Sequence, residues 1–503
     1  MKQTLQSWLR VLGVERLLLR VLLGACVVAF NFSGAATAAT AAPPNVIFIV
    51  TDDQGPWALA SESTSQALTP RLDRLAREGV VFRQAFCASA ICSAARAALI
   101  TGRYPSETGL LDFIADNGRN GMSLALSTWP GVLREAGYAT ALVGKWHLGH
   151  ARQEYLPTAR GYDFFSGYPI GGKTSQSPSV EVEGVWKTFA GEFTTEVLTD
   201  LAMDYVRRLR GRPFAISLHY WAPHANQGVP PGFKLPYDDR TWLPMKDEDI
   251  APWRDQPIRA PEPPAPQLDV PRYERIMREY LASVHGVDRN VGRLLDLLDE
   301  LGLARDTIVV FTSDNGYLLG QHGLWHKGSG WWLTTDRRDP AQLHGATRFN
   351  LYDESIRVPM LARWPARIRP GTVVREPVSH LDWFPTLLDA AGKGSGSVAE
   401  LRGRSLMPVF AGKSRDGDGT LFFQYVHLRG LRTPDWKLVR DFKAGRDELY
   451  DLRHDPGELT NLLPARDERA ASAHRNLLDQ LERRMREIGD RGEISTPSAG
   501  TKE

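Results

Sequence analysis

The chain has 503 residues, of which 42% are apolar and 24% are charged, and this composition is ordinary for a globular enzyme. It excludes a mainly disordered or coiled-coil protein, and the length allows one large domain plus a smaller one. The net charge is +2, but residues 1–42 carry four basic residues against one acidic residue, so the remainder is close to −1 and nothing favours a nucleic-acid partner.

Residues 1–42 have the order of an export signal: basic residues first, then an apolar run over 21–30, then small residues with two A-x-A sites. The apolar run is short for a membrane span, although residues 17–30 could serve as an uncleaved anchor. We therefore expect an exported protein, periplasmic or secreted, with N-terminal anchoring as the alternative.

Residues 45–50 form a continuous apolar, β-branched run, which predicts a strand buried on both faces. Asp52 and Asp53 follow it directly. Adjacent carboxylates at a strand end repel each other unless a cation or protons relieve them, and hard divalent cations prefer oxygen ligands. A metal site is one interpretation of this pair, and a turn with Asp caps is the other.

The stretch 91–105 predicts a helix of small residues that begins at Cys92 and carries Arg96 one turn later, on the same face. That position suits a nucleophile acting on sulfate or phosphate, because free amides, the helix dipole and a guanidinium would hold the anionic oxygens. A buried structural cysteine is one alternative. A Cys87–Cys92 disulfide, which would remove the nucleophile, is another.

Three further apolar runs predict buried strands, over 139–143, 214–221 and 307–312. The polar residues that follow these runs are Lys145 and His147, then His224, then Asp314 and Asn315. Helical sequence separates the strands, over 129–136, 194–209 and 272–302. Lys145 and His147 are two residues apart, so both side chains point to one side if strand geometry persists beyond residue 143.

Alternating strands and helices predict a mainly parallel α/β sheet, and ligand sites in such sheets form outside the carboxyl ends of the strands. One polar strand end would be chance, whereas four at one edge indicate a site. The eleven prolines of 230–271 exclude regular helix or central strand and favour a long ordered loop over that edge, with a solvated linker as the alternative. We expect the polar, Gly-rich segment 171–192 to be a surface excursion.

Residues 92–96 (Cys-Ser-Ala-Ala-Arg), followed by 101–104 (Thr-Gly-Arg-Tyr), resemble the signature of type I sulfatases, in which C-x-P/A-x-R is read by a maturation enzyme. In that family the cysteine is oxidised to formylglycine (3-oxoalanine), an aldehyde whose hydrate is the nucleophile. Ala94 stands where Pro is commoner in the family, and Ala95 where Ser is commoner.

The resemblance extends over residues 44–463, because other segments are similar to the family's motifs in the same order: 50–55, 144–149, 222–224, 312–316 and 320–329. It implies an alkaline-phosphatase-like fold with a mainly parallel central sheet flanked by helices. The implied domains are a catalytic domain over 43–412 and a C-terminal subdomain over 413–503. We expect strands at 420–428, 431–440 and 447–451 to form a small antiparallel sheet there, followed by a helix at 470–488.

The same resemblance implies the roles of the site residues. A divalent cation, calcium in the family, would be held by Asp52, Asp53, Asp314 and Asn315. The sulfuryl oxygens would be balanced by Arg96, Lys145, His224 and Lys327. The leaving alcohol would be assisted by His224 or Lys327, and His147 would take a proton from the second hydroxyl of the hydrated aldehyde at position 92. The segment 330–350, which contains Trp331, Trp332, Arg337 and Arg338, lengthens the usual spacing after Lys327.

The expected function is therefore hydrolysis of a sulfate monoester, either a small aryl ester or a carbohydrate ester, after processing by a formylglycine-generating enzyme. A phosphodiester or phosphonate monoester hydrolase on the same scaffold is one alternative. An unmodified, inactive relative that binds sulfated glycans is the other.

Overall fold

The computed structural model describes residues 42–492, apart from 63–64, 173–174, 225–245, 255, 262–267, 334–346 and 416. The predicted export segment, except residue 42, lies outside the described residues. So do much of the proline-rich stretch 230–271 and both Arg337 and Arg338. In the part of the chain that is described, we find no helix with both the length and the apolar character needed to cross a membrane.

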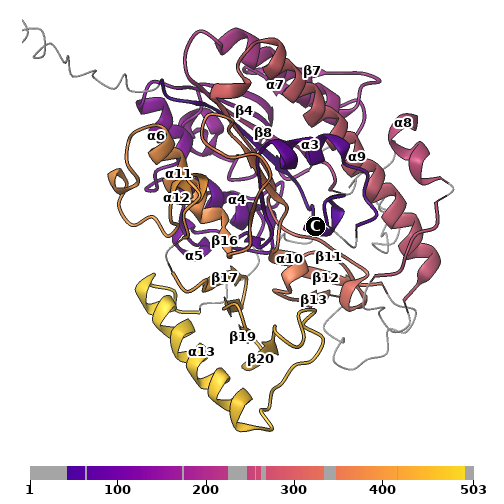
Figure 1. Cartoon of the computed structure of the whole chain (residues 1–503), viewed down its shortest axis with the longest axis vertical. Coiled ribbons are helices and arrows are strands. Elements are labelled where there is room, and N and C mark those ends of the chain that lie inside the picture. The colour runs from indigo at the N-terminus through magenta and orange to yellow at the C-terminus, as the bar shows by residue number, and fades with distance from the viewer. Residues whose placement is uncertain are drawn as a thin grey trace, which may run out of the picture. The chain divides into compact units, whose positions relative to one another are not determined.

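Among the described residues, ten strands form the central sheet of the fold. Figure 1 shows this sheet between helices. Five neighbouring strands in its middle are parallel to one another, and their spatial order is β9 (Thr307–Ser313), β1 (Asn45–Thr51), β8 (Phe214–His219), β4 (Ala139–Lys145) and β5 (Phe164–Tyr168). All four strands predicted from apolar runs are among them, side by side. The mainly parallel sheet is thus confirmed.

Shorter strands extend both edges of the sheet. Beyond β9 lie β14 (Met360–Arg363), β2 (Val80–Phe82) and β15 (Thr372–Val374), and β14 is antiparallel to β9 and to β2. Beyond β5 lies an antiparallel hairpin of β6 (Ser179–Val182) and β7 (Val185–Thr188). The expected surface excursion at 171–192 therefore contains two strands, which its weak apolar alternation did not indicate.

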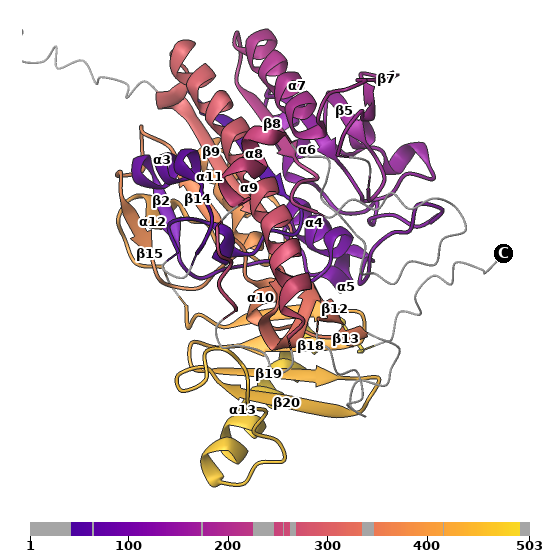
Figure 2. The same ribbon diagram turned by 90° about the vertical axis from the view of Figure 1, so that its right-hand side faces the viewer.

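Helices cover both faces of the sheet, and this explains the continuous apolar run of β1. Val46, Phe48 and Val50 belong to one core, whereas Ile47 and Ile49 belong to the other. The first core is completed by α4 (Cys92–Thr101), α6 (Trp129–Glu135), α11 (Trp383–Ala390) and α12 (Met407–Phe410). The second is completed by α3 (Pro70–Glu78), α7 (Thr194–Leu209) and the long α9 (Val270–Glu300), which crosses the view of Figure 2.

Several short strands and helices lie outside the central sheet. A small antiparallel sheet is formed by β10 (Leu318–Leu319), β11 (Leu324–His326), β12 (Ser329–Trp332) and β13 (Thr347–Phe349). A parallel pair is formed by β3 (Ala85–Phe86) and β16 (Val378–Ser379). Further short helices in the described residues are α5 (Pro105–Thr108), α8 (Asp247–Ile250) and α10 (Asp353–Ile356).

The C-terminal part contains a four-stranded antiparallel sheet whose strands follow chain order: β17 (Leu421–Tyr425), β18 (Leu428–Arg432), β19 (Trp436–Asp441) and β20 (Arg446–Asp451). The helix α13 (Glu468–Glu487) packs on this sheet through Leu477 and Leu481 (Figure 1). The antiparallel sheet was expected, but the single strand at 431–440 was wrong. A turn at Pro434 and Asp435 divides that stretch into two strands. The boundary between residues 412 and 413 stays a prediction.

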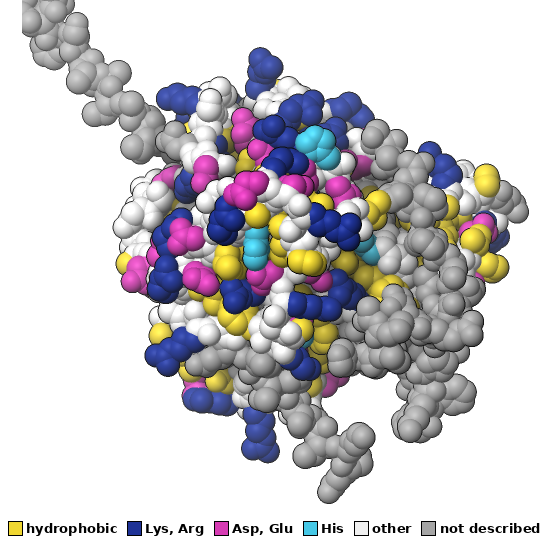
Figure 3. Space-filling view, turned by 90° about the horizontal axis from the view of Figure 1, so that it is seen from below, with side chains coloured by type: hydrophobic (Ala, Val, Ile, Leu, Met, Phe, Trp, Pro, Cys, Tyr) yellow, Lys and Arg dark blue, Asp and Glu magenta, His cyan; other side chains and the backbone are white. Residues whose placement is uncertain are grey.

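Acidic and basic side chains are intermixed on the face seen from below, as Figure 3 shows.

Candidate active site

Neighbouring strands of the central sheet end at the same level. Val50 of β1 is in register with His219 of β8, and Thr51 of β1 is in register with Ser313 of β9. The amide of Asp314 donates a hydrogen bond to Thr51 O (2.9 Å), which continues the pairing past the last strand residue. The segments that follow the strands therefore start from one common edge.

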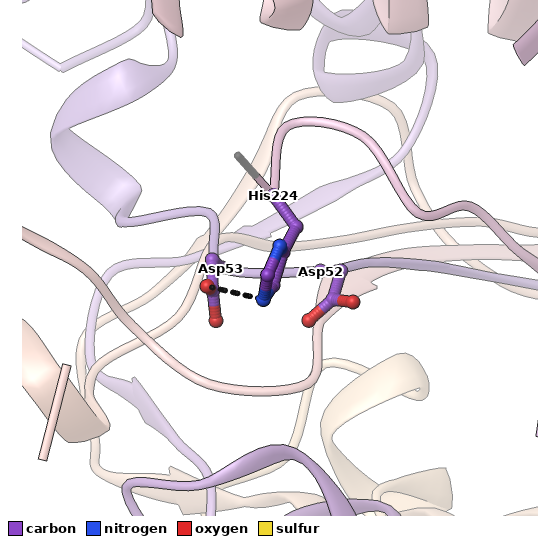
Figure 4. A group of neighbouring side chains, drawn as sticks. All are labelled: Asp52, Asp53 and His224. Atoms are coloured by element: carbon purple, nitrogen blue, oxygen red, sulfur yellow. Dashed lines mark ion pairs between the residues drawn. The ribbon is translucent and has the colours of Figure 1, made fainter. Parts of the chain in front are cut away.

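The four predicted cation ligands lie together at this edge, and each is at most 1% exposed: Asp52, Asp53, Asp314 and Asn315. The Asp53 amide donates to Asp314 Oδ1 (3.2 Å), and Asn315 Nδ2 donates to Asp53 Oδ1 (2.8 Å). Asp53 has a φ of +66°, a left-handed conformation that residues with a Cβ rarely adopt. In Figure 4 the carboxylates of Asp52 and Asp53 lie on either side of the His224 ring.

Each of the three carboxylates has its own buried cation. The pairs are Asp52 with Lys145 Nζ (2.5 Å), Asp314 with Arg96 Nε (2.8 Å), and Asp53 with Lys327 Nζ. Burial alone would raise the pKa of Asp52, but Lys145 and His224 outweigh burial, and the pKa is lowered. The three pairs cancel in charge, so a bound divalent cation would make the site positive and attractive to an anionic ester.

Cys92 is the first residue of α4, a helix that ends where Gly102 adopts a φ of +66°. Its Sγ lies 2.9 Å from Lys327 Nζ, and the residue is 4% exposed. Arg96 follows one turn later and reaches the same cluster. Burial raises the pKa of the Cys92 thiol to about 11, although Lys145 and Lys327 act in the opposite direction. An unmodified thiol at this position is therefore mainly protonated at neutral pH.

The guanidinium of Arg96 contacts several groups of the site. Besides its bond to Asp314, Nη1 donates to Lys145 O (3.3 Å). Its Nη2 is buried, lies 4.0 Å from Asp52 Oδ2, and has no hydrogen-bond partner among the described residues. This N–H group is a donor for which an anionic ligand would be a partner.

Lys145 and His147 both lie in the cluster, but not by the geometry we expected. β4 ends at Lys145, and His147 has a φ of +60°, so strand geometry does not persist between them. His147 Nε2 contacts Ile114 O (2.8 Å), whereas its buried Nδ1 has no hydrogen-bond partner within the described chain. Burial, followed by Lys145, lowers the pKa of His147 well below 6.5. The ring is thus neutral, donating from Nε2 and keeping Nδ1 as an acceptor.

His224 follows β8 and is 7% exposed. Its Nε2 lies 3.6 Å from Asp53 Oδ2, the contact dashed in Figure 4. Burial lowers the pKa of His224, although the carboxylates of Asp53 and Asp52 act against this shift.

The cluster has the donor chemistry of a site for a hard divalent cation. Ligand atoms of Asp52, Asp53 and His224 lie within 4.8 Å of one another, and so do those of Asp52, Cys92 and Asp314. Two oxygens, Asp52 Oδ1 and Asn315 Oδ1, are buried and have no hydrogen-bond partner among the residues that the structure describes. Buried acceptors of this kind are normally satisfied, so a cation fits them.

The two described cysteines are both free thiols, so the alternative of a Cys87–Cys92 disulfide is not found. Cys87 Sγ instead lies within hydrogen-bond distance of two carbonyl oxygens, Ser89 O (3.0 Å) and Ile356 O (3.1 Å), to which its single S–H can donate. Burial raises the pKa of Cys87 above its ordinary value, which makes it an inert structural thiol.

Two residues of this region were missed by sequence reasoning. His219, the last residue of β8, has its Nδ1 3.3 Å from Arg96 Nη1 and 3.1 Å from Lys145 O. Burial and Arg96 lower its pKa to about 3, so the ring is neutral. Tyr280 of α9 donates to Asp53 O (2.7 Å). Both occupy positions in apolar patterns that read as core, and the only signal was a histidine within the apolar run 214–221.

Two family models match this chain. A family model described as Sulfatase matches residues 44–393, and one described as N-sulphoglucosamine sulphohydrolase, C-terminal, matches 346–488. The N-acetylglucosamine-6-O-sulfatase of Bacteroides thetaiotaomicron is 27% identical over 89% of this chain and 87% of its own length.

Solved structures share the fold. A protein in complex with its substrate D-glucosamine-2-N,6-O-disulfate has a TM-score of 0.73 at 23% identity and covers 90% of this chain and 100% of its own. The phosphonate monoester hydrolase of Agrobacterium radiobacter has a TM-score of 0.62 at 21% identity, over 88% of this chain and 96% of its own. The fold alone therefore does not select one ester.

The family match does select one, because the Sulfatase model covers more than half of the chain. Membership implies a metal ion and a formylglycine residue, and the buried cluster of Asp and Cys side chains is consistent with both. The chain belongs to the sulfatase family and is a hydrolase of sulfate esters.

Proposed function

We propose that this sulfatase cleaves a sulfate monoester of an amino sugar, using a calcium ion and a formylglycine at position 92. The observation that carries the proposal is the gathering of Cys92, Arg96, Lys145 and Lys327 around three carboxylates at one sheet edge. The sugar is supported by the names of similar proteins, which include an N-acetylglucosamine-6-O-sulfatase and a structure holding a disulfated glucosamine.

Calcium would be held by Asp52, Asp53, Asp314 and Asn315, whose oxygens are the hard ligands that this ion prefers. When bound, the ion would polarise the sulfate and favour the ionised nucleophile. Support comes from the unsatisfied Asp52 Oδ1 and Asn315 Oδ1.

Formylglycine at position 92 would supply, as its hydrate, one hydroxyl that attacks sulfur and a second whose deprotonation releases sulfate. The raised pKa of the thiol supports a need for this change, because a protonated thiol is a poor nucleophile. The implied partner is a formylglycine-generating enzyme that reads residues 92–96.

The remaining side chains would hold the ester and move protons. The sulfuryl oxygens would contact the Arg96 Nη2, Lys145 Nζ and Lys327 Nζ groups, which reduce the developing charge. The leaving alcohol would receive a proton from His224 Nε2 or Lys327 Nζ. His147 Nδ1, an unpaired acceptor in the described structure, would accept the proton whose removal releases sulfate.

Export to the periplasm or the medium is part of the proposal and rests on the sequence of residues 1–42. To test it, cells that express the full chain are separated into cytoplasm, periplasm and medium, and sulfatase activity is measured in each fraction. Export predicts that the activity lies outside the cytoplasm.

Mass spectrometry of the peptide that contains residue 92, from protein made in its native host, is the first test. Formylglycine is expected, together with turnover of glucosamine 6-sulfate. Cys92→Ala should abolish turnover, whereas Cys87→Ala should retain it. An intact thiol with retained binding of sulfated sugars would instead support the inactive glycan-binding relative.

A second test compares ester classes at matched concentrations. Glucosamine 6-sulfate, 4-nitrophenyl sulfate, bis(4-nitrophenyl) phosphate and a phenyl phosphonate monoester are incubated with the same enzyme preparation. The proposal requires the highest kcat/KM with the sugar sulfate. A preference for either phosphorus ester would favour a phosphodiester or phosphonate monoester hydrolase on the same scaffold. A preference for the aryl sulfate would identify aryl sulfates, and not amino-sugar sulfates, as the substrate class.

A further inference from the structure

Tyr280 of α9 holds the turn that carries Asp52 and Asp53. Its hydroxyl donates to Asp53 O (2.7 Å) and accepts a hydrogen bond from the Gly55 N–H (3.2 Å). The residue has no exposed surface. One hydroxyl therefore acts as both donor and acceptor on the segment that presents two carboxylates to the cation cluster.

The ring of Tyr280 is restrained by two other aromatic rings. It stacks on Trp57 with ring centroids 5.1 Å apart and on Tyr317 with centroids 5.2 Å apart. Trp57 Nε1 donates to Tyr317 O (2.8 Å), which closes the stack. Because neighbouring rings and a 31-residue helix restrain it, the hydroxyl has a defined position.

Asp53 is the residue that needs such support. Its φ of +66° lies in the left-handed region, which strains a residue with a Cβ, although Asp tolerates it better than most. In that conformation its amide donates to Asp314 Oδ1 and its carboxylate accepts from Asn315 Nδ2. If the backbone of Asp53 relaxed, the carboxylate would move relative to Asp314 and Asn315.

We propose that Tyr280 is a positioning residue of the cation site. It holds the backbone of Asp53, so that the Asp53 carboxylate keeps its position beside Asp52, Asp314 and Asn315. The inference rests on the proposed role of these four residues as cation ligands. In this proposal Tyr280 acts through the backbone of Asp53, to which its hydroxyl donates.

Tyr280→Phe removes the hydroxyl and keeps the ring stack. Tyr273→Phe is the matched control, because Tyr273 lies on the same helix, is 1% exposed, and donates its hydroxyl to Arg259 O (2.8 Å). Calcium chloride is titrated calorimetrically into each purified, cation-depleted full-length protein. We expect the Kd to rise about tenfold in Tyr280→Phe, because both hydrogen bonds of the hydroxyl to the segment 53–55 are lost, and to stay within twofold in Tyr273→Phe.

A second readout separates positioning from general loss of structure. In Tyr280→Phe the calcium concentration that gives half-maximal turnover should rise, while kcat at saturating calcium should stay within threefold of wild type. Equal Kd values in wild type and Tyr280→Phe would overturn the inference, and so would equal increases in both variants. If wild-type protein binds no calcium, the proposed cation site itself fails, which is a distinct outcome.

Trp57→Phe provides an independent variant, because it keeps a ring beside Tyr280 but removes the Nε1 donor to Tyr317 O. A smaller rise in Kd, about threefold, is expected from the loosened stack. An unchanged Kd in both Trp57→Phe and Tyr280→Phe would refute the role of the stack.

Discussion

Lys327 makes two contacts that tie the nucleophile to the acidic cluster, one to Cys92 Sγ and one to Asp53. Lys327→Met keeps much of the stem but removes the charge. We expect kcat/KM for the sulfate ester to fall by at least about 100-fold, because a buried cation that faces developing charge is lost. Lys413→Met, at an exposed position, is the control and should be neutral. If the activity of Lys327→Met stays within threefold of wild type, Lys327 is not a catalytic residue.

The neutral state of His147 predicts a pH profile. Burial lowers its pKa well below 6.5, so the imidazole keeps its free Nδ1 as pH falls from 8 to 6.5 and is protonated only below that range. The acid limb of kcat against pH should therefore lie below 6.5. A limb near pH 7 that disappears in His147→Gln would contradict the assigned state.

Sequence reasoning identified ten site residues and the structure places them together, although their roles stay proposals. Strand ends and motif likeness pointed to them because polar groups after apolar runs stand out. His219 and Tyr280 were not identified, since a histidine inside a buried strand and a tyrosine on an apolar helix face look like core. Only coordinates show that their polar atoms face Arg96 and Asp53.

At the scale of elements, the path of β4 depends on Gly144. Its φ is +107°, and a Cβ there would come within 1.9 Å of His219 O on the neighbouring strand. Gly144→Ala should therefore destabilise the fold by about 3 kcal/mol or more, through strain and overlap together. Urea unfolding monitored by fluorescence measures the change.

Gly137→Ala is the matched control for that substitution. Gly137 has a similar φ of +92°, but a Cβ at this position would have no atom within 4 Å. The loss of folding stability in Gly137→Ala should be limited to the conformational cost of about 1–2 kcal/mol. Equal losses in the two variants would show that contact with β8 does not matter.

The elements that sequence reasoning found are those with strong periodicity. The apolar run of β1 and the long helix α9 were predicted within two residues of their observed ends. The hairpin β6–β7 was missed because its strands are four residues long, β7 is exposed throughout, and β6 has a single buried residue. The merged strand at 431–440 was wrong because apolar residues flank the Pro434 turn on both sides.

At the scale of the molecule, a buried ionic cluster joins the C-terminal sheet to the site region. Lys437 Nζ of β19 lies 3.0 Å from a carboxylate oxygen of Asp353 and 2.6 Å from a carboxyl oxygen of Glu458. Burial raises the pKa of Glu458 to about 8, although Lys437 acts against this. Asp353 shows the reverse, because Lys437 and Arg432 outweigh burial and lower its pKa.

This cluster predicts how stability depends on pH. The folded chain keeps the proton of Glu458 up to about pH 8, whereas the unfolded chain releases it near 4.3, so this group's contribution falls as pH rises between the two values. Glu458→Gln lacks that slope. Its stability relative to wild type should thus increase by roughly 2–4 kcal/mol from pH 5 to pH 9, as thermal unfolding measures. The exposed Glu482→Gln should show no such trend.

The order of strands in the sheet lay beyond sequence reasoning. Alternation predicted parallel neighbours, but it did not place β1 between β9 and β8, nor β14 antiparallel against β9. Such pairings depend on contacts between residues far apart in the chain, which no local pattern encodes.

The pairing of β1 with β9 also sets a timetable for biosynthesis. Asp53 and Asp314 are 261 positions apart, so a ribosome adding at most about 20 residues per second makes the second aspartate at least about 13 s after the first. Until then β1 lacks β9, and the edge of β1 that pairs with β9 is open to pairing with other nascent chains. A polypeptide truncated before residue 307 would carry that edge permanently, which makes such fragments prone to aggregate.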